Sequence, residues 1–242
     1  MRLDRFLAEC GIGTRTEVKK LIRSGAVSVN GEKIAKGDVH IAEETDVVAV
    51  GEKRIVYKKF VYLMLKKPQG YISSTRDGKM PTVMELVPEE YRHFEPFPVG
   101  RLDIDTEGFL LLTNDGDLAH RLLSPKKHIP KTYVALLEKC VTDEDIKAFE
   151  KGVILDDGYE TMPAKLRALT KEAPYYGEIV INEGKFHQVK RMFEAVGNRV
   201  VFLKRTKMNG LALDDTLPLG AVRELTDEEM ALLVPDENRK KD

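Results

Sequence analysis

Residues 99–117, with the sequence VGRLDIDTEGFLLLTNDGD, place a cluster of charge directly before an apolar run. One arginine and three acids occupy every second position from 101 to 107, and residues 109–112 read Phe-Leu-Leu-Leu. A short, continuous apolar run bounded by turn residues is typical of a strand that is buried on both faces. This stretch therefore predicts a central strand, and it raises the question of why so much charge lies where that strand begins.

The residues around this strand allow two interpretations of Asp103. It lies two positions from Arg101, which favours a structural ion pair or a turn cap. The alternative is a carboxylate that is retained for chemistry. Asp105 and Thr106 fit turn positions, and Asn-Asp-Gly at 114–116 predicts a further turn. The residues alone leave both interpretations of Asp103 open.

Length and composition indicate a globular chain. The 242 residues are 42% hydrophobic and 33% charged, enough for one large domain or for a large and a small one. No apolar stretch reaches the roughly 18 residues that span a bilayer, and the N-terminus has no hydrophobic signal region. We therefore expect a cytoplasmic protein with no membrane partner.

The net charge of −1 hides an uneven distribution of charge along the chain. Residues 1–42 hold eight Lys and Arg against five acids, and residues 185–207 hold seven against one. Residues 141–160 are acidic, with seven acids and two lysines. Each basic region fits a solvated face as well as an RNA-binding surface. The balanced total therefore does not exclude a nucleic-acid partner.

A basic helix near the N-terminus begins with a capping box. Thr14 and Glu17 have the N-cap and N3 spacing, and Gly25 ends the helix. Asn30-Gly31, between two short apolar runs, predicts a type I′ hairpin. Residues 1–58 are therefore predicted to form a small module and its connector.

Strands outnumber helices in residues 59–242, the predicted second domain. Residues 61–75 predict a strand, a Lys-Pro-x-Gly turn and a second strand, and residues 131–137 predict another strand. Residues 188–196 predict a helix with apolar positions at i, i+3, i+4 and i+7. Because few connections are long enough for helix-linked parallel strands, we predict an α+β fold with a mainly antiparallel, mixed sheet.

The sequence lacks the motifs of several kinds of catalytic site. It contains no glycine-rich phosphate loop, no dinucleotide fingerprint and no Gly-x-Ser-x-Gly motif. Its five histidines and two cysteines show no metal-ligand spacing. We therefore expect neither a metal nor a cofactor, which leaves the chemistry of carboxylates, tyrosines and basic side chains.

The segment GRLDIDTEGFLLLT at 100–113 resembles the signature of the RsuA family of pseudouridine synthases, Gly-Arg-Leu-Asp-x-x-Thr-x-Gly. Three further blocks agree in order: LKKPQGYISST at 65–75, KTYVALLE at 131–138 and EGKFHQVKRMFEAVGNRVVFLKR at 183–205. Residues 1–42 resemble an S4 RNA-binding domain, which precedes the catalytic domain in this family. The resemblance thus covers nearly the whole chain.

Two positions depart from the pattern of these families. Thr14 stands where S4 domains often have serine, and it still caps the helix. Lys190 stands where related synthases often have arginine, which keeps the charge but loses the bidentate fork.

The resemblance implies roles for particular side chains. Asp103 would be the catalytic carboxylate, acting covalently or as a base. Tyr133 would stack on the uracil, and Lys190 would pair with Asp103 and keep it ionised. The residues expected to contact RNA are Arg15, Lys19, Lys20 and Arg23 in the S4 domain, and Lys67, Arg101, Lys185, His187, Gln188 and Arg191 in the catalytic domain.

The resemblance also implies a substrate. Residues 183–198 are closer to small-subunit enzymes than to large-subunit relatives, so we expect a monomeric 16S rRNA pseudouridine synthase acting at the uridine-516-type site. One alternative is a 23S rRNA synthase with the same catalytic residues. Another is a non-catalytic, ribosome-associated RNA-binding protein in which Asp103 is only an ion-pair partner. The convergence of Asp103, Tyr133 and Lys190 in one cleft would distinguish the catalytic hypotheses from the last one.

Overall fold

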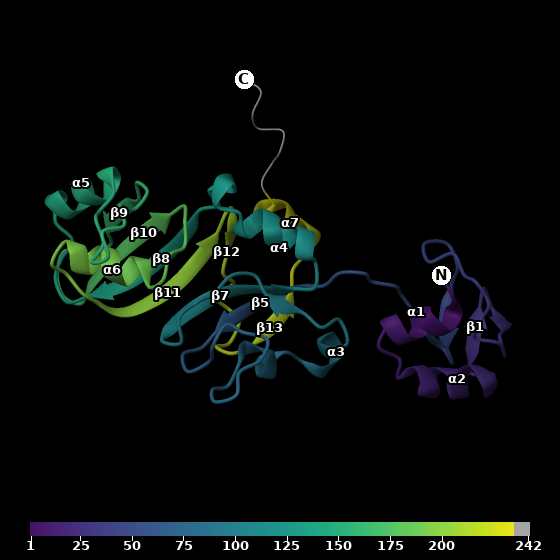
Figure 1. Ribbon diagram of the computed structural model, residues 1–242. Helices are drawn as coiled ribbons and strands as arrows, with labels where there is room; N and C mark the ends of the chain where they lie inside the picture. The colour runs from purple at the N-terminus through teal and green to yellow at the C-terminus, as the bar shows by residue number, and fades with distance from the viewer. Residues whose placement is uncertain (235–242) are drawn as a thin grey trace, which may run out of the picture. The chain divides into compact units, whose positions relative to one another are not determined.

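The protein is described by a computed structural model over residues 1–234, which divide into two compact units (Figure 1). Unit 1 comprises residues 1–61 together with 88–96, and unit 2 comprises residues 62–87 and those from 97 onward. No helix within residues 1–234 combines the length and apolar character needed to span a bilayer.

Unit 1 contains a four-stranded antiparallel sheet in the order β2-β1-β3-β4. Its elements are α1 Leu3–Glu9, α2 Arg15–Arg23, β1 Val27–Val29, β2 Glu32–Lys33, β3 Val48–Val50, β4 Lys53–Ile55 and α3 Glu89–Arg92. The predicted capping box is present at α2, where the Thr14 N–H donates to Glu17 at 2.8 Å. Asn30 and Gly31 have φ values of 52° and 85°, as the predicted hairpin requires.

The amphipathic pattern of α2 explains how unit 1 forms its core. Val18 and Ile22 of α2 are buried and belong to one apolar cluster with Phe6 of α1 and Val27 and Val48 of the sheet. The basic positions of the same helix remain exposed. Burial of one apolar stripe therefore leaves a positively charged face toward solvent.

Unit 2 is built on a nine-stranded sheet in which β7 and β11 are parallel and the other pairs are antiparallel. The main path runs β13-β5-β7-β11-β8-β10-β9, with β6 beside β7 and β12 beside β11. The predicted α+β class and mainly antiparallel sheet are confirmed. The strands are β5 Tyr62–Lys67, β6 Phe97–Pro98, β7 Thr106–Thr113, β8 Lys131–Leu137, β9 Lys165–Ala168, β10 Tyr175–Ile181, β11 Val200–Met208, β12 Leu211–Ala212 and β13 Val222–Glu224.

The helices of unit 2 gather in two places (Figure 1). Helices α4 and α7 lie near each other beside the middle of the sheet, and α5 and α6 lie at the end that holds β9 and β10. The helical elements are η1 Val83–Leu86, α4 Gly116–Leu123, η2 Pro125–Lys127, α5 Asp143–Lys151, α6 Gln188–Ala195 and α7 Asp227–Leu233.

Two local predictions in unit 2 are wrong. The second strand predicted after the Lys-Pro-x-Gly turn is not formed, because Ile72 makes only an isolated bridge with Thr82. The turn predicted at 114–116 is instead the start of α4, where the Asp115 carboxylate accepts from Leu118 N at 2.9 Å as an N-cap. Ile72 thus has backbone hydrogen bonds with the segment 81–83, whereas at 115 a side-chain hydrogen bond begins a helix.

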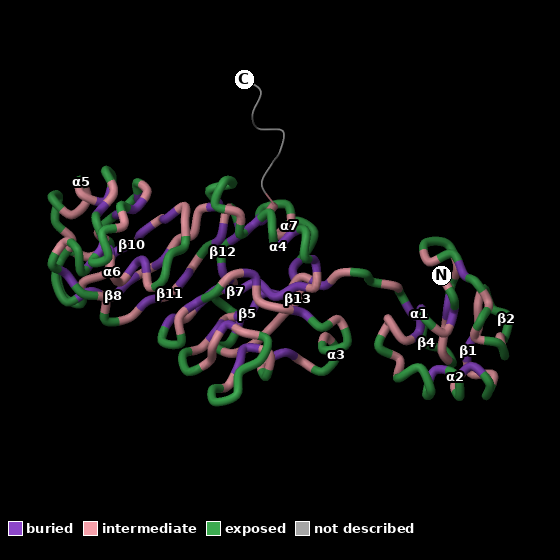
Figure 2. Tube along the Cα trace, viewed as in Figure 1, coloured by how far each residue is buried: buried purple, intermediate pink, exposed green. Residues whose placement is uncertain are grey.

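Strand β7 is the central strand predicted from its apolar run. Phe109 and Leu111 belong to the same buried cluster as Leu118 of α4 and Leu233 of α7. Leu110, which points to the opposite face, is also fully buried. Figure 2 shows the interior of the sheet as buried or half-buried and the surrounding turns as mostly exposed. Both faces of β7 are therefore covered, which gives the turn before it a rigid base.

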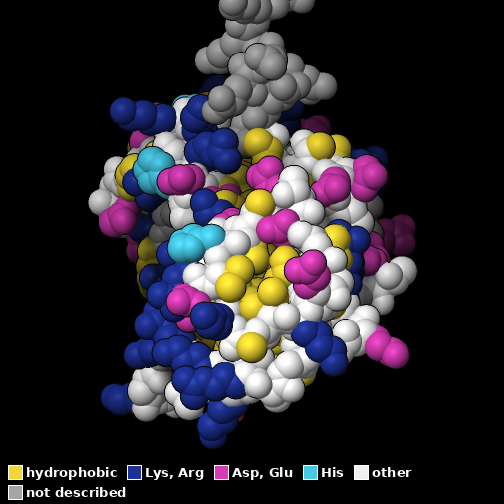
Figure 3. Space-filling view, turned by 90° about the vertical axis from the view of Figure 1, so that its right-hand side faces the viewer, with side chains coloured by type: hydrophobic (Ala, Val, Ile, Leu, Met, Phe, Trp, Pro, Cys, Tyr) yellow, Lys and Arg dark blue, Asp and Glu magenta, His cyan; other side chains and the backbone are white. Residues whose placement is uncertain are grey.

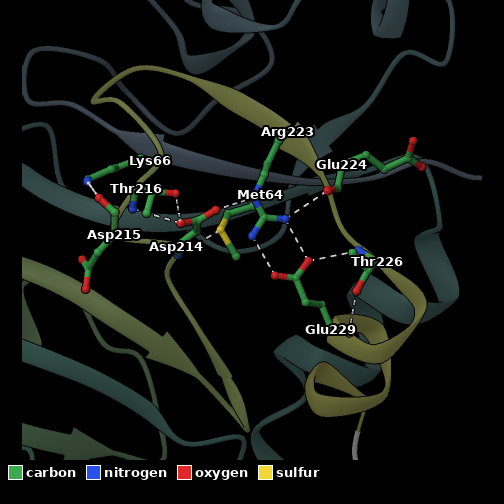
Figure 4. Close-up of polar contacts among 9 residues, drawn as sticks. All are labelled: Met64, Lys66, Asp214, Asp215, Thr216, Arg223, Glu224, Thr226 and Glu229. Carbon is green, nitrogen blue, oxygen red and sulfur yellow. Dashed lines mark hydrogen bonds and ion pairs between the residues drawn. The ribbon is translucent and has the colours of Figure 1, made fainter.

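An ion-pair network ties the last strand of unit 2 to its C-terminal helix (Figure 4). Arg223 on β13 donates to Glu229 on α7 at 2.8 and 2.7 Å, and its Nε donates to Asp214 at 2.8 Å. Glu229 also accepts from the Thr226 N–H at 3.0 Å and completes the capping box of α7. Hydrogen bonds from Thr216, together with the Arg223 guanidinium, lower the pKa of Asp214 to about 2.

We predict that Arg223→Met lowers the melting temperature in a pH-dependent way. A lowered pKa means that Asp214 contributes stability that is present above about pH 4 and lost as the pH falls toward 2. The melting temperature at pH 7 should fall by roughly 3–8 °C, and the difference from the wild type should narrow in acid. Circular dichroism melts between pH 7 and pH 2.5 measure both effects.

The control for this experiment is Arg167→Met. Arg167 pairs with Glu178 at 2.9 Å, but its side chain is 67% exposed, so its loss should change the melting temperature little. Equal losses from the two variants would contradict a structural role for the Arg223 network.

Candidate active site

The turn that carries Asp103 is held by hydrogen bonds from both directions. Ser73 Oγ donates to the Leu102 carbonyl and accepts from the Leu102 N–H, both at 3.0 Å. On the other side of Asp103, the Thr106 N–H donates to the Asp103 carbonyl at 3.1 Å. The backbone around Asp103 is therefore fixed before any contact of its carboxylate is considered.

Lys67 at the end of β5 supports the same turn from the interior. It is fully buried, and its ammonium donates to the carbonyls of Pro68, Asp103 and Thr106, each at 3.0 Å. Burial lowers the pKa of Lys67 to about 8. All three contacts are internal, so Lys67 supports the turn and presents no exposed surface for the predicted RNA contact.

The Asp103 carboxylate faces two basic side chains from the segment around α6. Lys190 Nζ lies 3.2 Å from one carboxylate oxygen, and His187 Nε2 lies 3.7 Å from the other. The Asp103 side chain is 26% exposed and that of Lys190 is 18% exposed. Arg101 is exposed and does not pair with Asp103 within residues 1–234. The ion pair that the sequence suggested between neighbours is thus made instead with a residue 87 positions away.

Lys190 is shared between two carboxylates. Its Nζ lies 2.6 Å from Asp105, closer than it lies to Asp103. Burial acts to lower the pKa of Lys190, but its contacts with Asp105 and Asp103 outweigh that effect and raise the pKa. Asp105 is a turn residue as predicted, with a 61% exposed side chain. Its contact with Lys190 is a positioning contact that the sequence pattern did not indicate.

These groups border a cavity of about 740 Å³ in unit 2. Arg101, Asp103, Tyr133, Lys185 and His187 are all among its lining residues. The volume lies within the range of small-molecule sites and accommodates one nucleotide unit. The predicted residues Asp103 and Tyr133 therefore line a single cavity, and Lys190, which is not among the lining residues, is paired to Asp103.

Tyr133 lies on β8 in the middle of the sheet. It pairs in register with Ile179 of β10 and Arg205 of β11, and it is 7% exposed. The alternation of β8 places every second residue, from Tyr133 onward, in the interior. Tyr133 therefore gives the cavity a nearly fixed aromatic wall.

In the loop before α6, the predicted residue Lys185 is exposed to solvent, whereas Gln188 at the start of the helix is buried. Gln188 is 4% exposed, donates to Glu183 at 2.7 Å and accepts from the Lys185 N–H at 2.8 Å. Both ends of its amide therefore close this loop, and the residue also lines the cavity. Phe186 is 73% exposed and stacks on the His187 ring, with the ring centroids 3.8 Å apart.

Arg191 joins the basic segment to the acidic one. Its guanidinium contacts Asp156 and lies 2.7 Å from Asp157, and its side chain is only 14% exposed. Both aspartates belong to the acidic stretch 141–160. The charge of Arg191 is therefore paired within unit 2, and its predicted RNA contact stays a prediction.

The basic face of unit 1 has the opposite character. Lys and Arg side chains gather along the lower edge of the face shown in Figure 3, at the level of α2. The basic residues of α2 are exposed, and none forms an ion pair within the described part of the chain. They are Arg15, Lys19, Lys20 and Arg23. An unpaired cationic helix face suits the phosphate backbone of a nucleic acid.

Comparison with known families agrees with both units. The family model described as RNA pseudouridylate synthase matches residues 61–195, and the S4 domain model matches residues 1–47. This chain belongs to the RNA pseudouridylate synthase family. As a member, it is a pseudouridine synthase, which is an isomerase.

Relatives of this pseudouridine synthase extend over its whole length. The uncharacterized RNA pseudouridine synthase YtzG of Bacillus subtilis is 50% identical over 96% of this chain and 98% of its own length. Ribosomal small subunit pseudouridine synthase A of Escherichia coli K12 is 41% identical over 97% of this chain and 100% of its own. A crystal structure of a pseudouridylate synthase, 39% identical, covers 97% of this chain and all of its own, with a TM-score of 0.67.

The structure adds residues to the synthase site that the sequence did not indicate. Thr106, Lys131, Phe186 and Arg205 also line the cavity. Three of them lie on strands whose neighbours across the sheet were unknown from the sequence. Phe186 was the exception, since an aromatic residue between Lys185 and His187 is an available signal for base stacking. Within residues 1–234 there is no group of three or more side chains that would ligate a metal.

We predict that Lys67→Met destabilises the synthase and impairs its activity together. Removing the ammonium leaves three buried carbonyls without this donor, which should lower the free energy of unfolding by roughly 2–4 kcal/mol. The loosened turn should reduce turnover at least about tenfold. Thermal unfolding and tritium release from [5-³H]uridine RNA measure the two effects.

Lys66→Met is the matched control, since Lys66 neighbours Lys67 on β5 but points to the other face, half-buried, and donates to the Asp215 carbonyl at 3.1 Å. It should retain wild-type turnover. A Lys67→Met protein with full activity would show that the turn does not depend on this ammonium.

Proposed function

We propose that the protein isomerises one uridine of the small-subunit (16S) rRNA, at the uridine-516-type site, to pseudouridine. The full-length similarity to ribosomal small subunit pseudouridine synthase A supports this choice of RNA. We further propose that it acts as a cytoplasmic monomer with residues 1–58 as the RNA-binding module and residues 59–242 as the catalytic domain.

One observation carries the catalytic part of this proposal. The Asp103 carboxylate is held against Lys190 beside a cavity that Tyr133 lines. In the reaction the N1–C1′ bond breaks, the base turns, the C5–C1′ bond forms, and a proton leaves C5 while N1 gains one. Asp103 serves this sequence as a nucleophile or as a base, and both routes use an oriented carboxylate.

The cavity supplies the binding half of the mechanism. The target uridine leaves its stack and enters the cavity, where the Tyr133 ring covers the base. Arg101 and Lys185 are exposed at the lining and suit the flanking phosphates. Phe186, stacked on His187 at the same border, offers an exposed ring to a neighbouring base.

Mapping of pseudouridine tests the substrate assignment. Both rRNAs are isolated from cells with and without the protein and probed by carbodiimide modification and primer extension. We expect one small-subunit position to lose its signal in the deletion strain. Loss of a large-subunit position instead would favour a 23S rRNA synthase.

We predict that Asp103→Asn abolishes pseudouridine formation while leaving the fold and RNA binding intact. The substitution is nearly isosteric, but it removes the ionised oxygen that the reaction needs. Turnover measured by tritium release should fall at least about a thousandfold, with an unchanged melting temperature within a few degrees.

Asp105→Asn is the control, because Asp105 shares Lys190 but is 61% exposed. It should keep turnover within about tenfold of the wild type, since its proposed role is to position Lys190. If Asp105→Asn were the inactive variant and Asp103→Asn the active one, the assignment of the catalytic carboxylate would be wrong.

We predict that the basic face of α2 contributes affinity through phosphate contacts. Each phosphate contact adds about 0.7–0.9 to the slope of log K against log salt. Replacing Arg15, Lys19, Lys20 and Arg23 together by glutamine should therefore lower that slope by up to about 3 and weaken binding at low salt. Filter binding of an rRNA fragment at several salt concentrations measures the slope.

Two exposed lysines of α5, Lys147 and Lys151, provide the control for this charge effect. Changing both to glutamine should leave the slope unchanged, because they lie in the acidic segment. A quadruple α2 variant with a wild-type slope would mean that this face does not contact RNA.

A further inference from the structure

Two buried side-chain nitrogen or oxygen atoms in residues 1–234 have no hydrogen-bond partner, and both belong to residues that line the same cavity. They are Thr106 Oγ1 and Arg205 Nη2. Each residue is only 1% exposed. Buried donors of this kind are nearly always satisfied in proteins. Their joint presence in one cavity indicates a polar surface that is built for a ligand.

The sheet holds the Arg205 guanidinium rigidly. Arg205 on β11 pairs with Gly108 on β7 and with Tyr133 on β8. Its Nε donates to the Phe109 carbonyl at 2.7 Å. Gly108 has a φ of 109°, and a Cβ there would lie 2.1 Å from the Arg205 carbonyl oxygen, so only glycine allows this approach of the two strands. Nη2 is therefore a fixed donor.

Thr106 lies on β7, the strand that pairs with the Arg205 strand β11. It lies two residues before Gly108 on β7, so both point to the same face of the sheet. Its carbonyl accepts from Lys67 Nζ at 3.0 Å, which leaves the hydroxyl as its remaining polar group. The Thr106 and Arg205 side chains thus approach the cavity from two adjacent, hydrogen-bonded strands.

We propose that Arg205 Nη2 and Thr106 Oγ1 form the base-reading end of the cavity and bind the carbonyl oxygens of the target uracil. This inference rests on the proposed function of the site. Tyr133 is the cross-strand neighbour of Arg205, so an aromatic ring for the face of the base lies next to a donor for its edge. Lys131 also lines the cavity, and its ammonium donates to the Ile129 carbonyl at 3.0 Å.

The chemistry of the reaction gives this arrangement a specific advantage. A half-turn of uracil about its N3–C6 axis exchanges N1 with C5 and, at the same time, O2 with O4. A fixed donor therefore meets a carbonyl oxygen before the turn and again after it. The same donor supports the free base while its electron density is highest, between cleavage of the N1–C1′ bond and formation of the C5–C1′ bond.

The same symmetry excludes cytidine. Cytosine carries an amino group at C4, which is a donor and cannot accept from Arg205. If Arg205 binds O4 of the incoming base, the cytosine amino group prevents binding on entry. If Arg205 binds O2 first, the amino group faces Arg205 only after the half-turn and prevents binding there. A site that hydrogen-bonds its substrate discriminates strongly, because the wrong ligand leaves a buried donor unpaired.

Thr106→Val provides the first test, since it removes a hydroxyl that has no partner in the described protein and preserves the shape of the side chain. We expect an unchanged or higher melting temperature together with a loss of kcat/KM of about tenfold on a uridine transcript. A purely structural threonine would give the same stability result with unchanged turnover, and that outcome would overturn the proposal.

Thr113→Val is the matched control at the other end of β7. Thr113 is equally buried but lies outside the cavity, and its hydroxyl accepts from the Asp115 N–H at 3.1 Å. It should show the reverse pattern, with a lower melting temperature and unchanged kcat/KM. Loss of activity in both variants would attribute the Thr106 effect to the strand instead of the ligand.

The second test combines Arg205→Met with target transcripts that carry 2-thiouridine or 4-thiouridine at the modified position. Sulfur is a weaker acceptor than oxygen, so wild-type kcat/KM should fall about tenfold with at least one of them. In Arg205→Met, checked for folding by its melting curve, the same replacement should cost less than about twofold. Products are separated as nucleosides after nuclease digestion.

The outcomes separate this inference from the proposed function. A wild-type protein that is inactive on every uridine transcript contradicts the proposed function. An active wild type with a fully active Thr106→Val variant, or with equal thio effects in the wild type and Arg205→Met, contradicts only the base-reading role.

Discussion

The turn that carries Asp103 depends on its contacts with the buried ammonium of Lys67. A cation in the interior needs oxygen partners, and the nearest ones are the carbonyls of Pro68, Asp103 and Thr106. These carbonyls belong to the residue that follows β5, to the turn and to the first residue of β7. Satisfying one charge therefore joins the two strands and the turn into a single rigid piece, with the Asp103 side chain directed outward from it.

Two lysine side chains hold this turn, one through its backbone and the other through its acids. Lys67 donates to backbone carbonyls from the interior of unit 2, while Lys190 forms ion pairs with the carboxylates of Asp103 and Asp105. Because a single ammonium faces two acids, its position is defined from both sides of the turn. The charged residues that precede β7 are thus neither ordinary caps nor a uniform solvated rim. They divide into an acid directed to the cavity and an acid that orients its partner.

The segregated charges of the sequence also meet in the folded chain. Arg191 of the basic segment is paired with Asp156 and Asp157 of the acidic one. The same guanidinium lies 3.4 Å from the Phe186 carbonyl, so this ion pair helps to hold the loop that borders the cavity. The positive charge of Arg191 in α6 therefore stabilises the fold of unit 2. The four cations of α2, by contrast, form no ion pair within residues 1–234 and are exposed to solvent.

The sequence by itself determined the elements whose signals are local. Capping boxes, the Asn-Gly hairpin and the period-2 and period-3.6 patterns fixed the positions of α2, β8 and α6 within about a residue, because they depend only on neighbours along the chain. The apolar run of β7 likewise showed a strand covered on both faces. The order of the four sequence blocks that resemble the family then indicated the family and the role expected of the Asp103 carboxylate.

Only the tertiary structure decided which basic residues are exposed and which stabilise the interior. Lys66 and Lys67 are adjacent and chemically identical, yet one is half-buried and the other is fully buried. Gln188 and Arg205 were equally ambiguous. The partner of Arg205 lies on a strand that the sequence does not place beside it, at the Phe109 carbonyl 96 positions away. A buried polar group is defined by the acceptors around it, and those acceptors come together only when the sheet is assembled.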